Sequence, residues 1–311
     1  MKLTKRVNQL LQRKKVKLSK EKNAQDYKWL VWKNNSCRLD AFMTIFTLLL
    51  YNKDELCQIL NEEGANSLGY HEIICTADIL NYGGNASEIE RLWKGLINLN
   101  VENKADFQRF GSPVPLFNLF SDKFDVLLSY KINKKCIKCL KKEKETVHVM
   151  KCLIEIDCSP LNFIDMDFQA EIDQMFEDKA EKCPNCFNDD TFVTSFVVHN
   201  QPKYLFVLLN NCIEARYNNE LQQMIKPNKF IRKMNLTGTI NWSLGEPHFN
   251  CCLKDPCYYD INACKFINLG GWYHHDGKVN NGRLTLIGNS LKINFNQVKP
   301  YIFIFKSLDE Y

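Results

Sequence analysis

The chain has 311 residues, of which 45% are hydrophobic and 12% aromatic, enough to bury a substantial core in one large domain or two smaller ones. Its formal net charge of +5 is uneven, because residues 1–22 hold nine Lys or Arg and one Glu and the remaining residues sum to −3. No apolar stretch is long enough to span a membrane, and the first residues lack the apolar core of a secretory signal peptide. Fourteen cysteines without such a signal favour a reducing compartment, so we expect a nuclear or cytoplasmic protein whose paired cysteines bind metal.

Residues 1–26 form a basic extension that we expect to be disordered. Its run RKKVK, Arg13–Lys17, is typical of a nuclear-import signal or a nucleic-acid-binding patch. An import receptor and nucleic acid are therefore candidate partners of this extension. A solubilising extension is the slightly favoured alternative. Nothing in the sequence favours a membrane partner.

The rest of the chain changes from a helical to a strand-like pattern near residue 125. Apolar periodicity predicts helices over 37–50, 53–63 and 87–100. Strand-like segments follow, over 125–132, 146–157, 191–200, 203–211 and 301–308. A helical first half followed by an antiparallel β half predicts an α+β fold.

Cys37 stands at the start of a predicted helix, in the segment NNSCRLDAF. Asn35 or Ser36 can cap this helix, which puts the thiol in the first turn. There the helix dipole and the unpaired N–H groups favour the thiolate, the form of cysteine that attacks carbonyls, and Arg38 adds a positive charge. The apolar run Leu39–Leu50 fits a helix buried in a larger body. Taken locally, Cys37 is either a nucleophile on a rigid element or one of many buried cysteines.

Two CxxC turns, separated by 43 residues, form a candidate zinc site. Each turn can supply two thiolates, and two such turns complete a closed tetrahedral site. Both turns follow a Lys and lie at the ends of strand-like segments, and Pro184 favours a turn. We therefore expect structural Zn²⁺ rather than two turns without metal, with four ligands: Cys136, Cys139, Cys183 and Cys186.

A cysteine nucleophile needs a histidine as base and usually an Asp or Asn that orients it. His248 enters a predicted strand after a turn, and Asp276 lies at a strand-to-turn junction. His274 and His275 are neighbours on a strand, so they point to opposite faces. The other histidines lie in a polar loop, on a solvent-facing strand position and at a strand end: His71, His148 and His199. The residues alone do not choose the base.

With these residues in view, the chain resembles the ubiquitin-specific protease superfamily of papain-like cysteine peptidases over residues 27–308. It is most similar to a divergent branch, the ubiquitin-specific-protease-like SUMO isopeptidases. NNSCRLDAF resembles the family's Cys box, and the two CxxC turns match its zinc-binding fingers. QPKYLFVLLNN resembles the strand before its His box, PHFNCCL its Gly-His-Tyr strand, and WYHHDGKV its Trp-Tyr-x-x-Asp turn. The order of these motifs makes the match specific.

The resemblance implies one papain-like catalytic domain over 27–311. Within it, the resemblance implies a helical thumb over 27–124, zinc-binding β fingers with part of the palm over 125–200, and a β palm over 201–311. It implies three catalytic roles: Cys37 as nucleophile, His248 as base and Asp276 as the group that orients the base. It also implies structural Zn²⁺, and ubiquitin or a ubiquitin-like protein such as SUMO, with its conjugates, as partner.

The chain departs from the family pattern at several positions. Trp32 stands where the family places the side chain that binds the oxyanion, which leaves Asn34 or Asn35 as substitutes, together with the Cys37 backbone N–H. Pro247 replaces the Gly before the family's His, and the segment KDPCYYDINACKF is inserted after it. The acidic, glutamine-rich box of typical ubiquitin proteases is not recognisable.

We therefore expect a thiol-dependent isopeptidase that removes ubiquitin or a ubiquitin-like modifier from lysine side chains. One alternative is an inactive pseudoprotease of the same fold that binds such a modifier or scaffolds partners, which Trp32 and Pro247 favour. A zinc-containing nucleic-acid-binding protein is a third interpretation. It leaves Cys37, His248 and Asp276 unexplained, and the acidic body fits it poorly.

Overall fold

A computed structural model describes residues 37–45, 113–114, 127–143, 146–151, 153–157, 167–210, 222–246, 248–260, 265–279, 284–291, 293 and 297–308. The described residues are mostly β-sheet, with the helices α2 (Cys37–Ile45) and α7 (Phe168–Met175). Several predicted segments lie outside these residues: the basic extension and the helices predicted over 53–63 and 87–100. Of the predicted helical thumb, little besides α2 is described. So do five residues singled out in the sequence: Trp32, Asn34, Asn35, His71 and Pro247.

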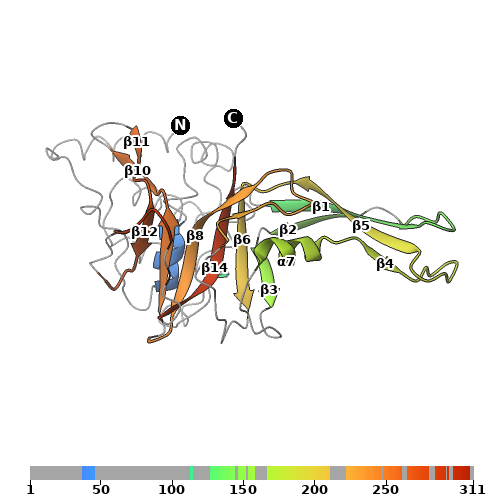
Figure 1. Cartoon of the computed structure of the whole chain (residues 1–311), viewed down its shortest axis with the longest axis horizontal. Helices are drawn as coiled ribbons and strands as arrows, with labels where there is room; N and C mark the ends of the chain where they lie inside the picture. The colour runs from blue at the N-terminus through green and yellow to red at the C-terminus, as the bar shows by residue number, and fades with distance from the viewer. Residues whose placement is uncertain are drawn as a thin grey trace, which may run out of the picture.

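The strands of the described residues form three sheets (Figure 1). The main sheet has the strand order β13-β12-β9-β8-β14-β6-β3, and β7 pairs with β8. Its strands are β3 (Leu153–Asp157), β6 (Tyr204–Asn210), β7 (Met224–Ile225), β8 (Met234–Ser243), β9 (Phe249–Lys254), β12 (Trp272–His275), β13 (Thr285–Gly288) and β14 (Val298–Ser307). The extended sheet has the order β2-β1-β5-β4, from β1 (Leu127–Cys136), β2 (Thr146–Lys151), β4 (Lys179–Glu181) and β5 (Phe192–Asn200). A separate hairpin pairs β10 (Cys257–Asp260) with β11 (Lys265–Asn268).

The predicted strand segments are confirmed, with two differences in how they are arranged. The segment 146–157 is two strands in different sheets, since β2 pairs with β1 and β3 pairs with β6. The pairing of β3 with β6 is parallel, whereas an antiparallel β half was expected. Parallel neighbours need a long connection rather than a tight turn, and here α7, β4 and β5 lie between β3 and β6 in the sequence.

Helix α7 was not predicted, although its sequence carries a start signal. Asp167 is its N-cap and accepts a hydrogen bond from the Ala170 backbone N–H at 3.1 Å. Phe168 and Ile172, four residues apart, form its buried face. The Phe168 ring lies 4.6 Å from the ring of Phe303 on β14, centroid to centroid, so α7 packs against the main sheet.

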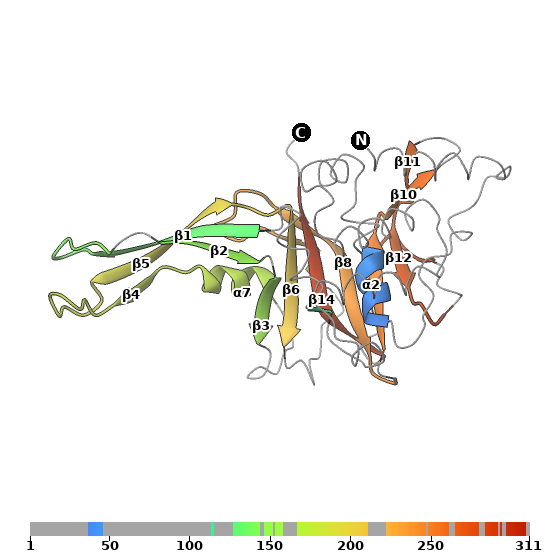
Figure 2. The ribbon, with the colours of Figure 1, turned by 180° about the vertical axis from the view of Figure 1, so that it is seen from behind.

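The core of the main sheet is apolar and nearly continuous. On β6 the six residues from Tyr204 to Leu209 are all buried, as expected for a central strand, and β14 adds four buried residues from Ile302 to Phe305. Helix α2 packs on β9 and β8, and Figure 2 shows it against this part of the main sheet. A rigid sheet therefore supports the helix that begins at Cys37.

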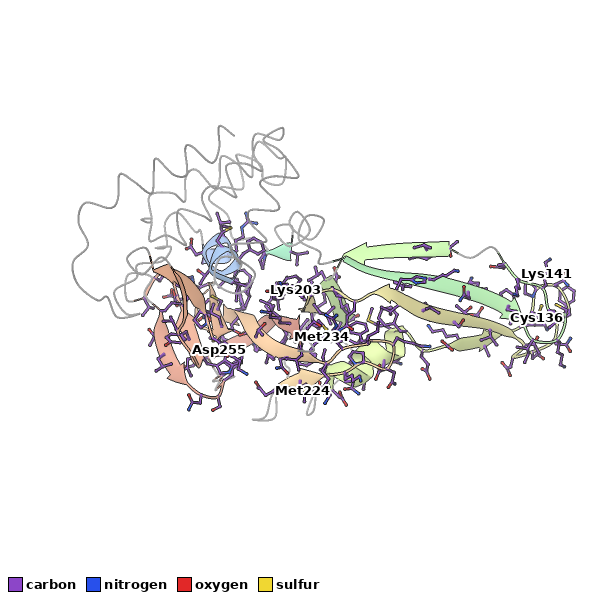
Figure 3. The ribbon with its side chains drawn as sticks, turned by 90° about the horizontal axis from the view of Figure 1, so that it is seen from above. Cys136, Lys141, Lys203, Met224, Met234 and Asp255 are labelled. Carbon is purple, nitrogen blue, oxygen red and sulfur yellow. The ribbon has the colours of Figure 1, made fainter. Side chains whose placement is uncertain are left out.

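Aromatic rings join the extended sheet to the main sheet. Phe176, which ends α7, makes ring contacts with Tyr130 on β1 and Phe196 on β5, and also with Phe230. From this junction the extended sheet points away from the main sheet, and Cys136 and Lys141 lie at its far end (Figure 3). No helix in the described part of the chain is long and apolar enough to cross a membrane.

Candidate active site and cysteine cluster

Cys37 lies where the sequence predicts it, in the first turn of a buried helix. All nine residues of α2 are buried, including Arg38 and Asp40, and Cys37 itself is 2% exposed. The first N–H groups of a helix have no partner within the helix and carry its positive dipole end. The thiol therefore stands in an electropositive setting that can receive a developing negative charge.

His248 and Asp276 meet although 28 positions separate them in the sequence. Strands β9 and β12 are antiparallel neighbours, so the residue just before β9 lies beside the residue just after β12. His248 Nε2 is 2.7 Å from Asp276 Oδ1, and both side chains are largely buried. The Lys278 backbone N–H donates to the same carboxylate oxygen at 2.8 Å, which fixes the carboxylate.

The charges at this pair favour an imidazolium beside a carboxylate. Burial by itself would lower the pKa of His248, but the hydrogen bond to Asp276, the nearby Cys37 thiol and their charges outweigh it and raise this pKa to about 9. Burial opposes ionisation of Asp276 as well, yet the hydrogen bonds from His248 and Lys278 hold the pKa of Asp276 below its usual value. At neutral pH His248 therefore holds a proton, as an imidazolium beside the carboxylate of Asp276.

The geometry leaves one ring nitrogen of His248 for the thiol. Nε2 is occupied by Asp276, while Nδ1 is buried and has no nitrogen or oxygen partner within the described residues. Cys37 is close enough to contribute to the raised pKa of His248. Nδ1 is thus the atom positioned to take the proton of the Cys37 thiol.

The other described histidines lie in different settings. His274, next in space to the pair, has a pKa that burial lowers first and repulsion from His248 lowers further, which together outweigh the attraction of Asp276. His275 is buried, and its Nδ1 lies 3.3 Å from Thr44 Oγ1 on α2. His148 and His199 lie on the extended sheet, on β2 and β5. The sequence did not indicate the contact between His275 and Thr44, because only the fold brings the two residues together.

The four predicted zinc ligands come together at the far end of the extended sheet. Strand β1 ends at Cys136, and the second CxxC turn lies between β4 and β5. Because β5 pairs with both β1 and β4, the two turns meet. The four sulfur atoms all lie within 4.8 Å of one another.

The spacing of these sulfurs fits a tetrahedral ion. Sulfurs bound at about 2.3 Å to one zinc ion lie about 3.8 Å apart. Here Cys136 Sγ is 3.6 Å from Cys186 Sγ, and Cys139 Sγ is 3.8 Å from Cys183 Sγ. Backbone N–H groups of Cys139 and Cys186 point at the sulfur of the first cysteine in their own turn, at 3.3 and 3.5 Å. The cluster can therefore hold a metal ion, and its all-thiolate donors suit Zn²⁺.

Comparison with known proteins bears on the fold. No family model matches the chain, and no curated protein matches it. Among solved structures it is similar to a SAGA DUB module of Ubp8, Sgf11, Sus1 and Sgf73 bound to monoubiquitin, with a TM-score of 0.58 and 12% identity. It is also similar to the Ubp8/Sgf11/Sus1/Sgf73 module bound to ubiquitin aldehyde, with a TM-score of 0.57 and 12% identity. Each match covers 99% of this chain and 74% of that chain.

The fold is similar to that of a ubiquitin-specific protease. This likeness confirms the sequence resemblance at the level of the fold, at low identity. The finer assignment to the SUMO-isopeptidase branch and the division into thumb, fingers and palm stay predictions. The inserted segment includes β10 and the start of β11, and this hairpin lies in the sequence between β9, which follows His248, and β12, which precedes Asp276.

Proposed function

We propose that the protein is a thiol-dependent isopeptidase that removes ubiquitin or a ubiquitin-like modifier such as SUMO from lysine side chains. The observation that carries the proposal is the bond between His248 Nε2 and Asp276 Oδ1, beside a cysteine at a helix start. The ubiquitin-protease-like fold supports ubiquitin as the first modifier to test. The reducing compartment expected from the cysteine content supports action in the nucleus or cytoplasm.

In the proposed mechanism, His248 Nδ1 takes the proton of Cys37, and the thiolate attacks the carbonyl carbon of the modifier's C-terminal glycine. His248 then gives this proton to the nitrogen of the leaving lysine as the C–N bond breaks. Water, deprotonated by His248, attacks the thioester, releases the modifier's carboxylate and restores the thiol. Asp276 holds the imidazole in the tautomer and orientation that these transfers need, and it stabilises the imidazolium.

The developing oxyanion needs hydrogen-bond donors. Trp32 stands where the family places the side chain that supplies one of them, so another group must take its place. The backbone N–H of Cys37, at the start of α2, is one such donor. The side chains of Asn34 and Asn35 are the proposed second donor, and both lie outside the described residues.

We also propose that Cys136, Cys139, Cys183 and Cys186 hold a structural Zn²⁺. The sulfur spacing and the N–H groups that point at Cys136 and Cys183 support this assignment. With four thiolates the coordination is closed, so the ion would brace the end of the extended sheet and take no part in hydrolysis.

The second candidate is a pseudoprotease that binds a modifier without cleaving it. Trp32 favours this alternative, because a tryptophan cannot offer the amide that the family uses at this position. A bound modifier with an intact isopeptide bond would be its signature.

Electrophilic probes test both candidates. Ubiquitin and SUMO carrying a C-terminal electrophile are incubated with the wild-type chain, with Cys37→Ala and with Cys252→Ala, in which another buried cysteine is removed as a matched control. We expect a covalent adduct on the wild type and on Cys252→Ala, and none on Cys37→Ala. A folded wild type that binds a modifier but forms no adduct would favour the pseudoprotease.

A further inference from the structure

Helix α2 and the main sheet share a buried polar contact within an apolar interface. We call the four residues Asp40, Thr44, Cys251 and His275 the polar seam. All four are between 0% and 2% exposed. Asp40 and Thr44 are four residues apart on α2 and therefore lie on one face of the helix. Cys251 on β9 and His275 on β12 are direct partners across the two strands.

The seam connects the helix and the sheet at identifiable points. Thr44 Oγ1 lies 3.3 Å from His275 Nδ1, a hydrogen bond between α2 and β12. Burial raises the pKa of the Cys251 thiol, and the negative charges of Asp40 and Asp276 are close enough to raise it further. Thr44 thus contacts His275, and Asp40 lies close enough to Cys251 for its charge to act on that thiol.

The neighbours of the seam are the proposed catalytic groups. Cys37 lies seven positions before Thr44, about 10 Å along the helix axis. His275 directly precedes Asp276, the residue that holds His248. The contact between Thr44 and His275 therefore joins the helix that carries the thiol to the strand that leads to the carboxylate.

Apolar packing alone does not fix the position of a helix on a sheet closely. Most other α2 side chains are apolar and buried, among them Leu39, Phe42, Met43 and Ile45. Hydrophobic attraction is not directional, so such a face tolerates small sliding and rotation. A hydrogen bond imposes a distance and an angle. Its partners are costly to leave unpaired when buried, so one register of the helix is favoured.

We propose that Thr44 and His275 are positioning residues, whose hydrogen bond sets the register of α2 on β9 and β12 and so holds the Cys37 thiol at His248. This inference rests on the proposed isopeptidase function for its consequence in turnover. It does not make either residue part of the chemistry.

Two substitutions at residue 44 separate positioning from general stability. Thr44→Val has the same shape but no hydroxyl, and Thr44→Ser keeps the hydroxyl and loses a methyl group. Thr237→Val is the matched control, because Thr237 on β8 also makes a hydrogen bond, to the Ile304 carbonyl, and belongs to the same sheet. His275→Asn and His275→Leu repeat the comparison from the other side, with and without a polar group.

Alkylation of Cys37 by iodoacetamide reports thiol activation without any modifier. Its rate is measured in the full-length zinc-loaded chain, by mass spectrometry of the peptide that contains Cys37. We expect Thr44→Val and His275→Leu to lower this rate and kcat on the order of 10- to 100-fold, with KM little changed, since small misplacement of reacting groups costs this much. Thr44→Ser is expected to restore the rate to within about 3-fold, since it keeps the hydrogen bond. Thr237→Val is expected to lose thermal stability while its rate stays at the wild-type value.

Three results would overturn the inference: a wild-type alkylation rate in both Thr44→Val and His275→Leu, an equal loss in Thr44→Ser and Thr44→Val, or an equal loss in Thr237→Val. If Thr44→Val does not fold, His275→Leu and His275→Asn decide. Failure of the proposed function looks different, because the wild type would then form no adduct with either modifier probe while the alkylation rates would still rank the variants.

Discussion

Leu140 and Phe187 occupy equivalent places at the far end of the extended sheet. Each follows the second cysteine of its CxxC turn, each has a positive φ, of 59° and 56°, and each is more than 60% exposed. The left-handed conformation costs a non-glycine residue roughly 1–2 kcal/mol. Neither side chain packs well enough to offset this cost, so the turn geometry, required by the four cysteines, imposes it.

Glycine at position 140 is therefore expected to stabilise the cysteine cluster. Leu140→Gly removes the strain and loses little buried surface, so we expect zinc to be held equally or more tightly, by up to about 1 kcal/mol. Ile137→Gly is the control, because Ile137 is similarly exposed but lacks a positive φ, and there glycine only adds chain entropy. Competition with a chromophoric chelator measures both. Weaker zinc binding in Leu140→Gly than in Ile137→Gly would show that the exposed leucine has another role.

Loss of a single cluster cysteine is expected to abolish metal binding. Cys183→Ser leaves three thiolates and removes the sulfur that the Asn185 and Cys186 N–H groups point at, so the zinc content should fall from about one ion per chain to near zero. Cys252→Ala, which removes a buried cysteine of the main sheet, should keep the full content. Elemental analysis of the purified proteins decides. A metal content in Cys183→Ser equal to that of the wild type would contradict the proposed ligand set.

The local patterns in the sequence were enough to predict the start of the first helix, several strands and the ligands of the cysteine cluster. The CxxC spacing predicted which four cysteines meet, and the capped apolar run predicted that α2 begins near Cys37 and is buried. Apolar runs also predicted six of the strands, β1, β2, β3, β5, β6 and β14, but they did not predict the ten-residue strand β8. Helix α7 was missed although Asp167 caps it, because its eight residues carry only two buried apolar positions and lie between strands.

Apart from the meeting of the two CxxC turns, which the chemistry of a zinc site predicts, contacts between distant residues could not be predicted from the local patterns. Six histidines competed for the role of base, and only the resemblance to a family chose His248. Its contact with Asp276 depends on β9 and β12 being neighbours, which is set by how the β10–β11 hairpin returns the chain. Thr44 and His275 are 231 positions apart, and the hydrophobic periodicity of neither segment predicts that they make contact.

Stability is expected to depend on pH through His248 and Asp276. The pKa of folded His248 is about 9, above its usual 6.5, so its contribution is fully present below about pH 6.5 and is lost as the pH rises through about 9. The pKa of folded Asp276 is lowered, so its contribution is present above about pH 4 and is lost as the pH falls. The pair therefore stabilises the fold most between these limits.

Asp276→Asn removes this pH dependence. Urea unfolding of the wild type and of Asp276→Asn should differ by as much as about 3 kcal/mol near pH 6 and by much less above about pH 9. Glu246→Gln is the control, because Glu246 pairs with Lys278 but is exposed, so this substitution should change stability little at either pH. An equal difference between the wild type and Asp276→Asn at both pH values would mean that His248 is not charged in the folded protein at pH 6.

The last prediction concerns the start of β12, the strand that leads to Asp276. Gly270 and Gly271 both have a positive φ, of 65° and 81°, so alanine is strained at either position. A Cβ on Gly271 would also lie 3.0 Å from the Gly288 carbonyl oxygen, while a Cβ on Gly270 would have no neighbour within 4 Å. Gly271 and Asp255 are joined by two hydrogen bonds where the β10–β11 hairpin leaves the main sheet (Asp255 is labelled in Figure 3). The Gly271 N–H donates to the Asp255 carboxylate, and the Asp255 N–H donates to the Gly271 carbonyl.

Gly271→Ala should therefore destabilise the fold more than Gly270→Ala. Both substitutions carry the conformational cost of roughly 1–2 kcal/mol, and only Gly271→Ala must also push β12 away from Gly288 on β13. Because β12 ends beside Asp276, the same displacement should slow the alkylation of Cys37 in Gly271→Ala and leave it unchanged in Gly270→Ala. Urea unfolding and peptide-level alkylation measure the two effects. Equal stability of the two variants would show that the Gly288 carbonyl moves aside at no cost.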